Sequence, residues 1–134
     1  MKALSILILS HGLLAKAFED SLKDACNCKI DVSSFCLFDE DNLDEYENIL
    51  EKKIEEKIKK EHSIILVTEM INGTPTNISL KLLKKFKDHI NVISNINMQL
   101  LIYLNNNFKK YSNIKDLINN GIKNSESILL EINE

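Results

Sequence analysis

Residues 4–12 read Leu-Ser-Ile-Leu-Ile-Leu-Ser-His-Gly. Apart from Ser5, the first six of these residues are apolar, which is typical of a parallel strand covered by helices on both faces. The run is too short to span a bilayer, and no small-residue cleavage pattern of a signal peptide follows it. We therefore expect a buried first strand over residues 4–9 that turns tightly into a helix at Ser10-His11-Gly12.

Helix and strand patterns alternate outward from this strand. Helices are predicted over residues 13–25, 41–60, 75–87, 97–108 and 114–132, and further strands over residues 31–38, 63–68 and 90–94. Residues 127–134 fit either the end of the last helix or a strand. The alternation predicts one α/β domain over residues 1–134, a doubly wound, mostly parallel sheet with helices on both faces. In the second interpretation of the C-terminus, an antiparallel edge strand is added.

Apolar residues at helical spacing predict the buried face of the first two helices. The stripe of the first helix comprises Leu14, Phe18, Leu22 and Ala25. The stripe of the second comprises Leu43, Tyr46, Leu50, Ile54 and Ile58. Asp41 is the expected N-cap of the second helix, and Pro75 fits the first turn of the third, where no backbone N–H is needed.

Composition excludes several classes of function. The net charge is -3 and no basic face stands out, so we expect no nucleic-acid partner. All 17 basic residues are lysines, which excludes sites that hold phosphate in an arginine fork. The three cysteines, Cys26, Cys28 and Cys36, form no pattern of metal ligands. We interpret them as reduced thiols of a cytoplasmic protein, and we expect neither a metal nor a cofactor.

The positions of the three histidines select one of them for chemistry. Ligands of open α/β sheets bind at the carboxyl ends of the strands, and only His11 follows a strand. His62 and His89 precede strands and should lie at the opposite edge. Glu69 ends the third predicted strand, where its carboxylate can accept a hydrogen bond from one imidazole nitrogen and leave the other as a nucleophile.

The loop after Glu69 predicts an anion site. The helix that Pro75 opens has free backbone N–H groups at its start, and the Thr74 hydroxyl lies beside them. Gly12 in the first turn lets a ligand approach closely. We therefore expect a phosphate contacted by Gly12, Asn72, Gly73 and Thr74. From spacing alone, the loop is equally consistent with an ordinary helix cap.

Three motifs resemble the IIA domain of mannose-family sugar phosphotransferase systems, in order and spacing, over nearly the whole chain. They are Ser10-His11-Gly12, Asn72-Gly73-Thr74-Pro75-Thr76-Asn77 and Asn95-Ile96-Asn97-Met98. The resemblance implies a phosphotransferase in which His11 accepts phosphate from HPr through Nε2 and passes it to a IIB partner. The IIB partner phosphorylates the sugar that a membrane permease imports. Thr74 matches the family's phosphate-contacting hydroxyl.

The chain departs from the family pattern at three places. Glu69 stands where the family has an aspartate that orients the histidine, and Asn72 replaces the first glycine of the loop. Gln99 follows Met98, and the proline that is usual in this segment is missing. Because the longer Glu69 can shift the carboxylate by more than the ~0.5 Å that a preorganised site tolerates, transfer competence depends on how its side chain folds back.

Two other functions use a similar first turn. The phosphotransfer subunit of dihydroxyacetone kinase has the same histidine position, but its usual turn resembles Ser-His-Ser, which Gly12 disfavours. A metal chelatase of tetrapyrrole synthesis also opens with a strand ending in His-Gly, but it needs a second histidine or an acid cluster on the same edge.

The segment Leu100-Leu101-Ile102-Tyr103-Leu104 predicts a homodimer, because it has more apolar residues than one helix face buries. The resemblance points the same way, since family members commonly dimerise and sometimes exchange a C-terminal strand.

Overall fold

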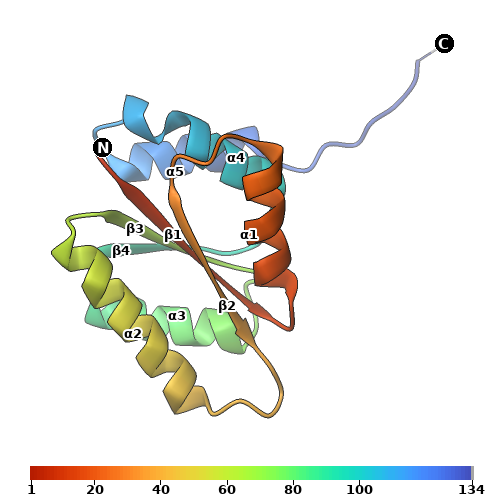
Figure 1. Ribbon diagram of the computed structural model, residues 1–134. Coiled ribbons are helices and arrows are strands. Elements are labelled where there is room, and N and C mark those ends of the chain that lie inside the picture. Colours follow the sequence, from red (N-terminus) through yellow and green to blue (C-terminus); the bar gives the residue numbers. More distant parts are fainter. Residues whose placement is uncertain (134) are drawn as a thin grey trace.

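The computed structural model describes residues 1–133, in which four parallel strands alternate with helices (Figure 1). The strands are β1 (Leu4–His11), β2 (Asp31–Leu37), β3 (Ser63–Thr68) and β4 (Ile90–Ile93). The helices are α1 (Leu14–Ala25), α2 (Leu43–Lys59), α3 (Thr74–Lys85), α4 (Met98–Asn107) and α5 (Ile114–Asn124), with a 3-10 turn at Phe108–Lys110. The strand order β2-β1-β3-β4 confirms the predicted doubly wound fold.

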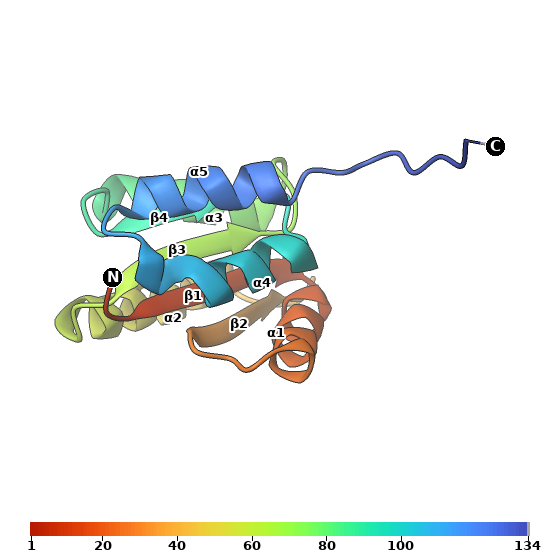
Figure 2. The ribbon, with the colours of Figure 1, turned by 90° about the horizontal axis from the view of Figure 1, so that it is seen from above.

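Helices α1, α4 and α5 cover one face of the sheet, and α2 and α3 cover the other (Figures 1 and 2). Strand β1 supplies both cores: Ile6 and Ile8 pack toward the first group, and Leu7 and Leu9 toward the second. All four side chains are fully buried. An uninterrupted apolar strand is therefore what a central position in a two-sided sheet requires.

The buried face of α1 differs from the predicted stripe. Ala15, Glu19 and Leu22 are buried, whereas Leu14 and Ala25 are exposed. A helix advances about 100° per residue, so a stripe of residues four apart drifts by about 40° at each step. The predicted stripe therefore lies partly inside and partly outside the buried face, which centres on Ala15 and Leu22.

The N-cap of α2 is Asn42, and the prediction of Asp41 is wrong. The Asn42 side chain accepts a hydrogen bond from the Glu45 N–H at 3.0 Å. Asp41 instead accepts from the Phe38 N–H at 2.8 Å and so closes the turn before the helix. Leu43, the first residue of the predicted stripe, is exposed at this end.

The last helix ends at Asn124, so the predicted helix over residues 114–132 is wrong beyond that residue. Residues 125–133 form neither helix nor strand, and the last residue of the alternative strand, 134, lies outside the described residues. The tail extends away from the body of the molecule (Figure 2). The apolar side chains of the tail are 76–88% exposed: Ile128, Leu129, Leu130 and Ile132. Within the described residues, no packing surface therefore stabilises a further helical turn.

Helix α4 is buried within the chain. Leu100, Leu101 and Leu104 are at most 1% exposed, and α4 packs against α1 and α5. Gly121 of α5 lies close enough that a Cβ there would come within 3.2 Å of Leu100. The premise of the dimer prediction is thus wrong, because a neighbouring helix covers the surplus apolar residues. None of the helices within residues 1–133 is long and apolar enough to cross a membrane.

Candidate functional site

His11 and Glu69 meet at the point where the strand order reverses. His11 is the last residue of β1, which lies between β2 and β3, and Glu69 directly follows β3. The chain leaves β1 toward β2 on one side and later returns to β3 on the other. Crevices at the carboxyl ends of strands form at such switch points. The sequence prediction that these two residues share an edge is confirmed.

One carboxylate oxygen of Glu69 accepts two hydrogen bonds from His11. Oε1 accepts from the His11 backbone N–H at 2.8 Å and from the imidazole Nδ1 at 2.5 Å. A carboxylate only accepts, so the hydrogen between them belongs to Nδ1. The Glu69 side chain is 14% exposed and that of His11 47%. Within residues 1–133, Nε2 has no hydrogen-bond partner, which leaves its lone pair available to a ligand.

Gly73 brings the loop between β3 and α3 against the imidazole ring. A Cβ at this position would lie 3.5 Å from His11 Cε1 and 3.8 Å from Met70 Cγ. Its φ of +153° is a conformation that side chains rarely adopt. Gly73 is also the N-cap of α3, and Thr74 begins that helix. The first-turn N–H groups, which have no intrahelical partner, therefore lie beside the ring.

The turn after His11 is fixed by two hydrogen bonds. The Gly12 N–H donates to the Leu37 carbonyl at 2.8 Å, and the Ser10 hydroxyl accepts from the Ala15 N–H at 2.7 Å. Gly12 has φ +58°, which explains glycine at this turn. Because its N–H is already bonded, Gly12 shapes the site rather than presenting a free donor. Asn72 is exposed in the loop before Gly73.

A family model described as the PTS system fructose IIA component matches residues 5–121. The chain belongs to this family. It is the mannose-type group of IIA components that the sequence resembles, and its members act as phosphotransferases of sugar uptake systems. The matched residues include both His11 and the loop that contacts it.

Solved structures of phosphotransferase system proteins share the fold. The component EIIA from Streptococcus agalactiae is 21% identical, with a TM-score of 0.79 over 90% of this chain and 91% of that chain. The mannose/sorbose-specific IIA subunit from Enterococcus faecalis is 18% identical, with a TM-score of 0.74 over 99% of this chain and 100% of that one. The IIA protein associated with the fucose utilization operon from Streptococcus pneumoniae is 20% identical, with a TM-score of 0.73 over 95% and 96%. No curated protein sequence is similar enough to the chain to count as a match.

Three hydroxyl groups next to the site of this IIA component were not foreseen from the sequence. Thr68 ends β3, Thr76 lies in the first turn of α3, and Ser94 follows β4. The Thr68 oxygen lies 2.7 Å from that of Thr76 and 3.0 Å from that of Ser94. Thr76 also bonds to the Met70 carbonyl. The only signal in the sequence is a hydroxyl residue at the end of each of these two strands.

Exposed apolar side chains surround the histidine of this family member. They follow the three strands that meet at the site and are 47–73% exposed: Leu13, Phe38, Met70 and Ile71. The loop that follows Phe38 adds three exposed acids, Asp39, Glu40 and Asp41. Exposed apolar residues gathered at the edge of the sheet that holds a reactive group are typical of a site that another protein covers.

The remaining histidines lie at the other edge of the sheet, as predicted. His62 precedes β3, where its Nδ1 lies 2.7 Å from the Ser5 hydroxyl, and His89 precedes β4 and is exposed. The buried Lys57 forms an ion pair there with Asp31. Burial alone would raise the Asp31 pKa, but the hydrogen bond and charge of Lys57 and the Ser5 hydroxyl lower the pKa below its ordinary value.

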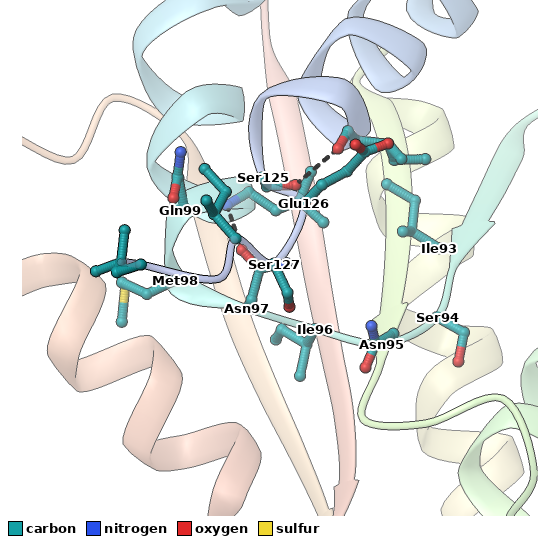
Figure 3. A pocket seen from close by; sticks show the side chains of 14 residues that line it. Ile93, Ser94, Asn95, Ile96, Asn97, Met98, Gln99, Ser125, Glu126 and Ser127 are labelled. Carbon is teal, nitrogen blue, oxygen red and sulfur yellow. Dashed lines mark hydrogen bonds between the residues drawn. The ribbon is translucent and has the colours of Figure 1, made fainter. Parts of the chain in front are cut away.

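A cavity of about 980 Å³ opens beside the site, between the segment that follows β4 and the start of the tail (Figure 3). Asn95, Asn97 and Gln99 line one side, and Ser125 and Ser127 line the other. Neither His11 nor Glu69 contributes to its wall. The cavity is therefore separate from the imidazole. Ile128 and Leu130 of the tail also line it, and both are largely exposed.

Proposed function

We propose that this IIA component is a phosphocarrier in which His11 accepts a phosphoryl group from phospho-HPr and passes it to a IIB partner. The observation that carries this proposal is that the two nitrogens of the His11 imidazole have different roles. Glu69 binds Nδ1–H, and no residue within 1–133 bonds Nε2, which lies at a half-exposed position. A histidine held in one tautomer with its other nitrogen accessible is ready to act as a nucleophile.

The transfer moves one phosphoryl group between two imidazoles. The Nε2 lone pair of His11 attacks phosphorus, the P–N bond of the donor breaks, and its electron pair returns to the donor ring. The Nδ1 hydrogen stays between His11 and Glu69, whose carboxylate stabilises the positive charge that develops on the ring. Transfer to IIB repeats these events in reverse, with His11 as the leaving group.

The phosphoryl oxygens would be held by neutral donors. We assign them to the Thr74 hydroxyl, to the Gly73 and Thr74 backbone N–H groups at the start of α3, and to the Asn72 amide. The positive end of the α3 dipole favours an anion at this place. Since the sequence contains no arginine, the bound group keeps most of its negative charge, which suits a carrier that must release it again.

The surface around His11 supports a protein partner rather than a small substrate. The exposed apolar residues, among them Leu13 and Ile71, would lie against the apolar surface of HPr or IIB. The acidic residues 39–41 would favour a basic rim on the partner. A small sugar would not need this apolar and acidic surface around His11. The permease would therefore act with this chain only through IIB. We place the reaction in the cytoplasm, where HPr acts.

We further propose a homodimer in which a second copy covers the tail. The apolar residues of this segment, including Leu129 and Leu130, are almost fully exposed in the single chain. In the described part of the chain, strand β4 pairs only with β3, so its outer edge is available to another strand. If the tail of one copy lies along the outer β4 edge of the other, both the apolar tail residues and that edge are removed from water.

Onward transfer tests the function as a whole. The protein is loaded with labelled phosphate from phosphoenolpyruvate through the general phosphotransferase enzyme and HPr, purified, and mixed with IIB proteins from the same genome. Loss of label from His11 and its appearance on one IIB protein is expected. A loaded protein that transfers to HPr but to none of the IIB proteins would contradict the carrier role and favour a regulatory one.

A further inference from the structure

The hydroxyl groups of Ser94, Thr68 and Thr76 form a chain with a defined direction. Each hydroxyl has one hydrogen to donate, and the Met70 carbonyl can only accept. Thr76 bonds both this carbonyl and Thr68, so its hydrogen goes to the carbonyl. Thr68 must then donate to Thr76, and Ser94 to Thr68. The chain runs from the end of β4, across the end of β3, to the loop that follows Glu69.

This row of hydroxyl groups fixes the backbone on both sides of Glu69. Thr68 is paired with Leu9 in the sheet and is fully buried, so the sheet fixes the position of the residue before Glu69. The residue after it, Met70, has a half-exposed side chain, and Thr76 holds its carbonyl. Thr76 itself is 4% exposed and belongs to α3. The loop between the strand and the helix is thus tied to the helix at the position adjacent to the carboxylate.

Glutamate needs this support more than a shorter acid would. Its side chain has three rotatable bonds, and the carboxylate must reach both the backbone N–H and Nδ1 of His11. A preorganised site tolerates displacements of ~0.5 Å. His11 holds the carboxylate end of Glu69 and the two backbone neighbours hold its other end, so a shift of the Met70 carbonyl changes the geometry of the hydrogen bond to Nδ1.

We propose that Thr76 is a positioning residue for phosphoryl transfer: its hydroxyl fixes the Met70 carbonyl and thereby keeps Glu69 on His11 Nδ1. The effect on transfer rests on the proposed function, whereas the effect on the imidazole does not. Among the described residues, the Thr76 hydroxyl bonds Thr68 and the Met70 carbonyl and not His11, so its influence is transmitted through the loop.

Thr76→Val keeps the shape of the side chain and removes the hydroxyl. We expect phosphorylation of His11 by phospho-HPr to slow about tenfold, since a misplacement of 1 Å in an active site can cost about 10²-fold. Thr76→Ser restores the hydroxyl and should remain within about twofold of the wild type, a loss far smaller than such a misplacement causes. Ser79→Ala is the matched control, because Ser79 is a buried hydroxyl of the same helix that donates to the Pro75 carbonyl within that helix.

Nitrogen-15 NMR of the unphosphorylated protein gives a readout that a general loss of stability does not move. At alkaline pH, where a histidine ring is ordinarily neutral, the wild type, Thr76→Ser and Ser79→Ala should show the hydrogen on Nδ1 of His11. Thr76→Val should show it shared between Nδ1 and Nε2. If that variant does not fold, Thr76→Ala, which adds no methyl group, replaces it in both measurements.

The two readouts separate this inference from the proposed function. A Thr76→Val protein with the Nδ1 hydrogen in place and the wild-type rate would overturn the positioning role while the carrier function stands. An equal loss in Ser79→Ala would also overturn it, because the effect would then belong to α3 as a whole. If HPr phosphorylates none of the proteins, the proposed function fails, and the NMR comparison alone decides the role of Thr76.

Discussion

Replacing Glu69 with glutamine removes a charge and little else from the site. The amide oxygen can take the place of Oε1 and accept the same two hydrogen bonds from His11. The backbone N–H of His11 holds that oxygen in position, so the imidazole should keep its hydrogen on Nδ1. Glu69→Gln therefore isolates the negative charge as the variable.

The size of the effect follows from the bond to the ring. A hydrogen bond to a charged group contributes about 1.5–3 kcal/mol, against about 0.5–1.5 kcal/mol for a neutral one. The ring gains positive charge as phosphorus bonds to Nε2, which adds to the difference, but water screens the half-exposed His11. We expect a net loss of about 1.5–3 kcal/mol in the transition state, or between about tenfold and about hundredfold in rate.

Rapid-quench measurement of phosphorylation by phospho-HPr gives this rate directly. Glu55→Gln is the matched control, because Glu55 is an exposed acid of α2 outside the surface around His11 and its loss changes the net charge equally. The control should react at the wild-type rate. A Glu69→Gln protein within about threefold of the wild type, well below the range of acid–base partners, would refute an electrostatic role for the carboxylate.

Three further predictions concern other parts of the molecule. Gly73→Ala should lower the unfolding midpoint, because φ +153° costs about 1–3 kcal/mol with a side chain, whereas the new methyl group makes only an ordinary contact with His11 Cε1 at 3.5 Å. Relief of this strain would move the loop that carries Thr74, so phosphorylation should also slow; thermal unfolding and transfer kinetics measure the two effects. Asp31→Asn should cost about 1–2 kcal/mol in urea unfolding at neutral pH, because it removes the nearer carboxylate from the buried Lys57 and leaves it with Glu56 at 3.7 Å. The pKa of Asp31 is lowered, so its contribution is complete above the ordinary value of 3.8 and is lost as the pH falls through the lower folded-state value; a difference between the proteins that persists below that pH would count against the ion pair. Deletion of residues 126–134 should convert the proposed dimer into a monomer in sedimentation at micromolar concentration, and a full chain that already sediments as a monomer would disprove the dimer.

The features that the sequence predicts well are local. The apolar run of β1 and the glycine after His11 place the histidine at a strand end, and Ser63–Thr68 places Glu69 at the next one. The rule for carboxyl ends then brings the two together without knowledge of the register. These inferences need only one strand each, and the structure confirms them.

The features that the sequence does not predict depend on more than one segment. The three hydroxyl groups come together because β4 lies beside β3 and the first turn of α3 contacts the end of β3: Thr68, Thr76 and Ser94. The end of α5 is not predicted because residues 126–132 have helical composition, whereas the rest of the described residues leave their apolar side chains exposed. The surplus apolar residues of α4 pointed to a partner chain, whereas α5 covers them.

The location of the phosphoryl group tests the central claim most directly. The wild type, His11→Ala and His89→Ala are incubated with phosphoenolpyruvate, the general phosphotransferase enzyme and HPr, and their intact masses are measured. His89 is exposed at the opposite edge of the sheet and serves as the control. The wild type and His89→Ala should each gain one acid-labile phosphoryl group, and His11→Ala should gain none. A phosphorylated His11→Ala protein would contradict the assignment of the site.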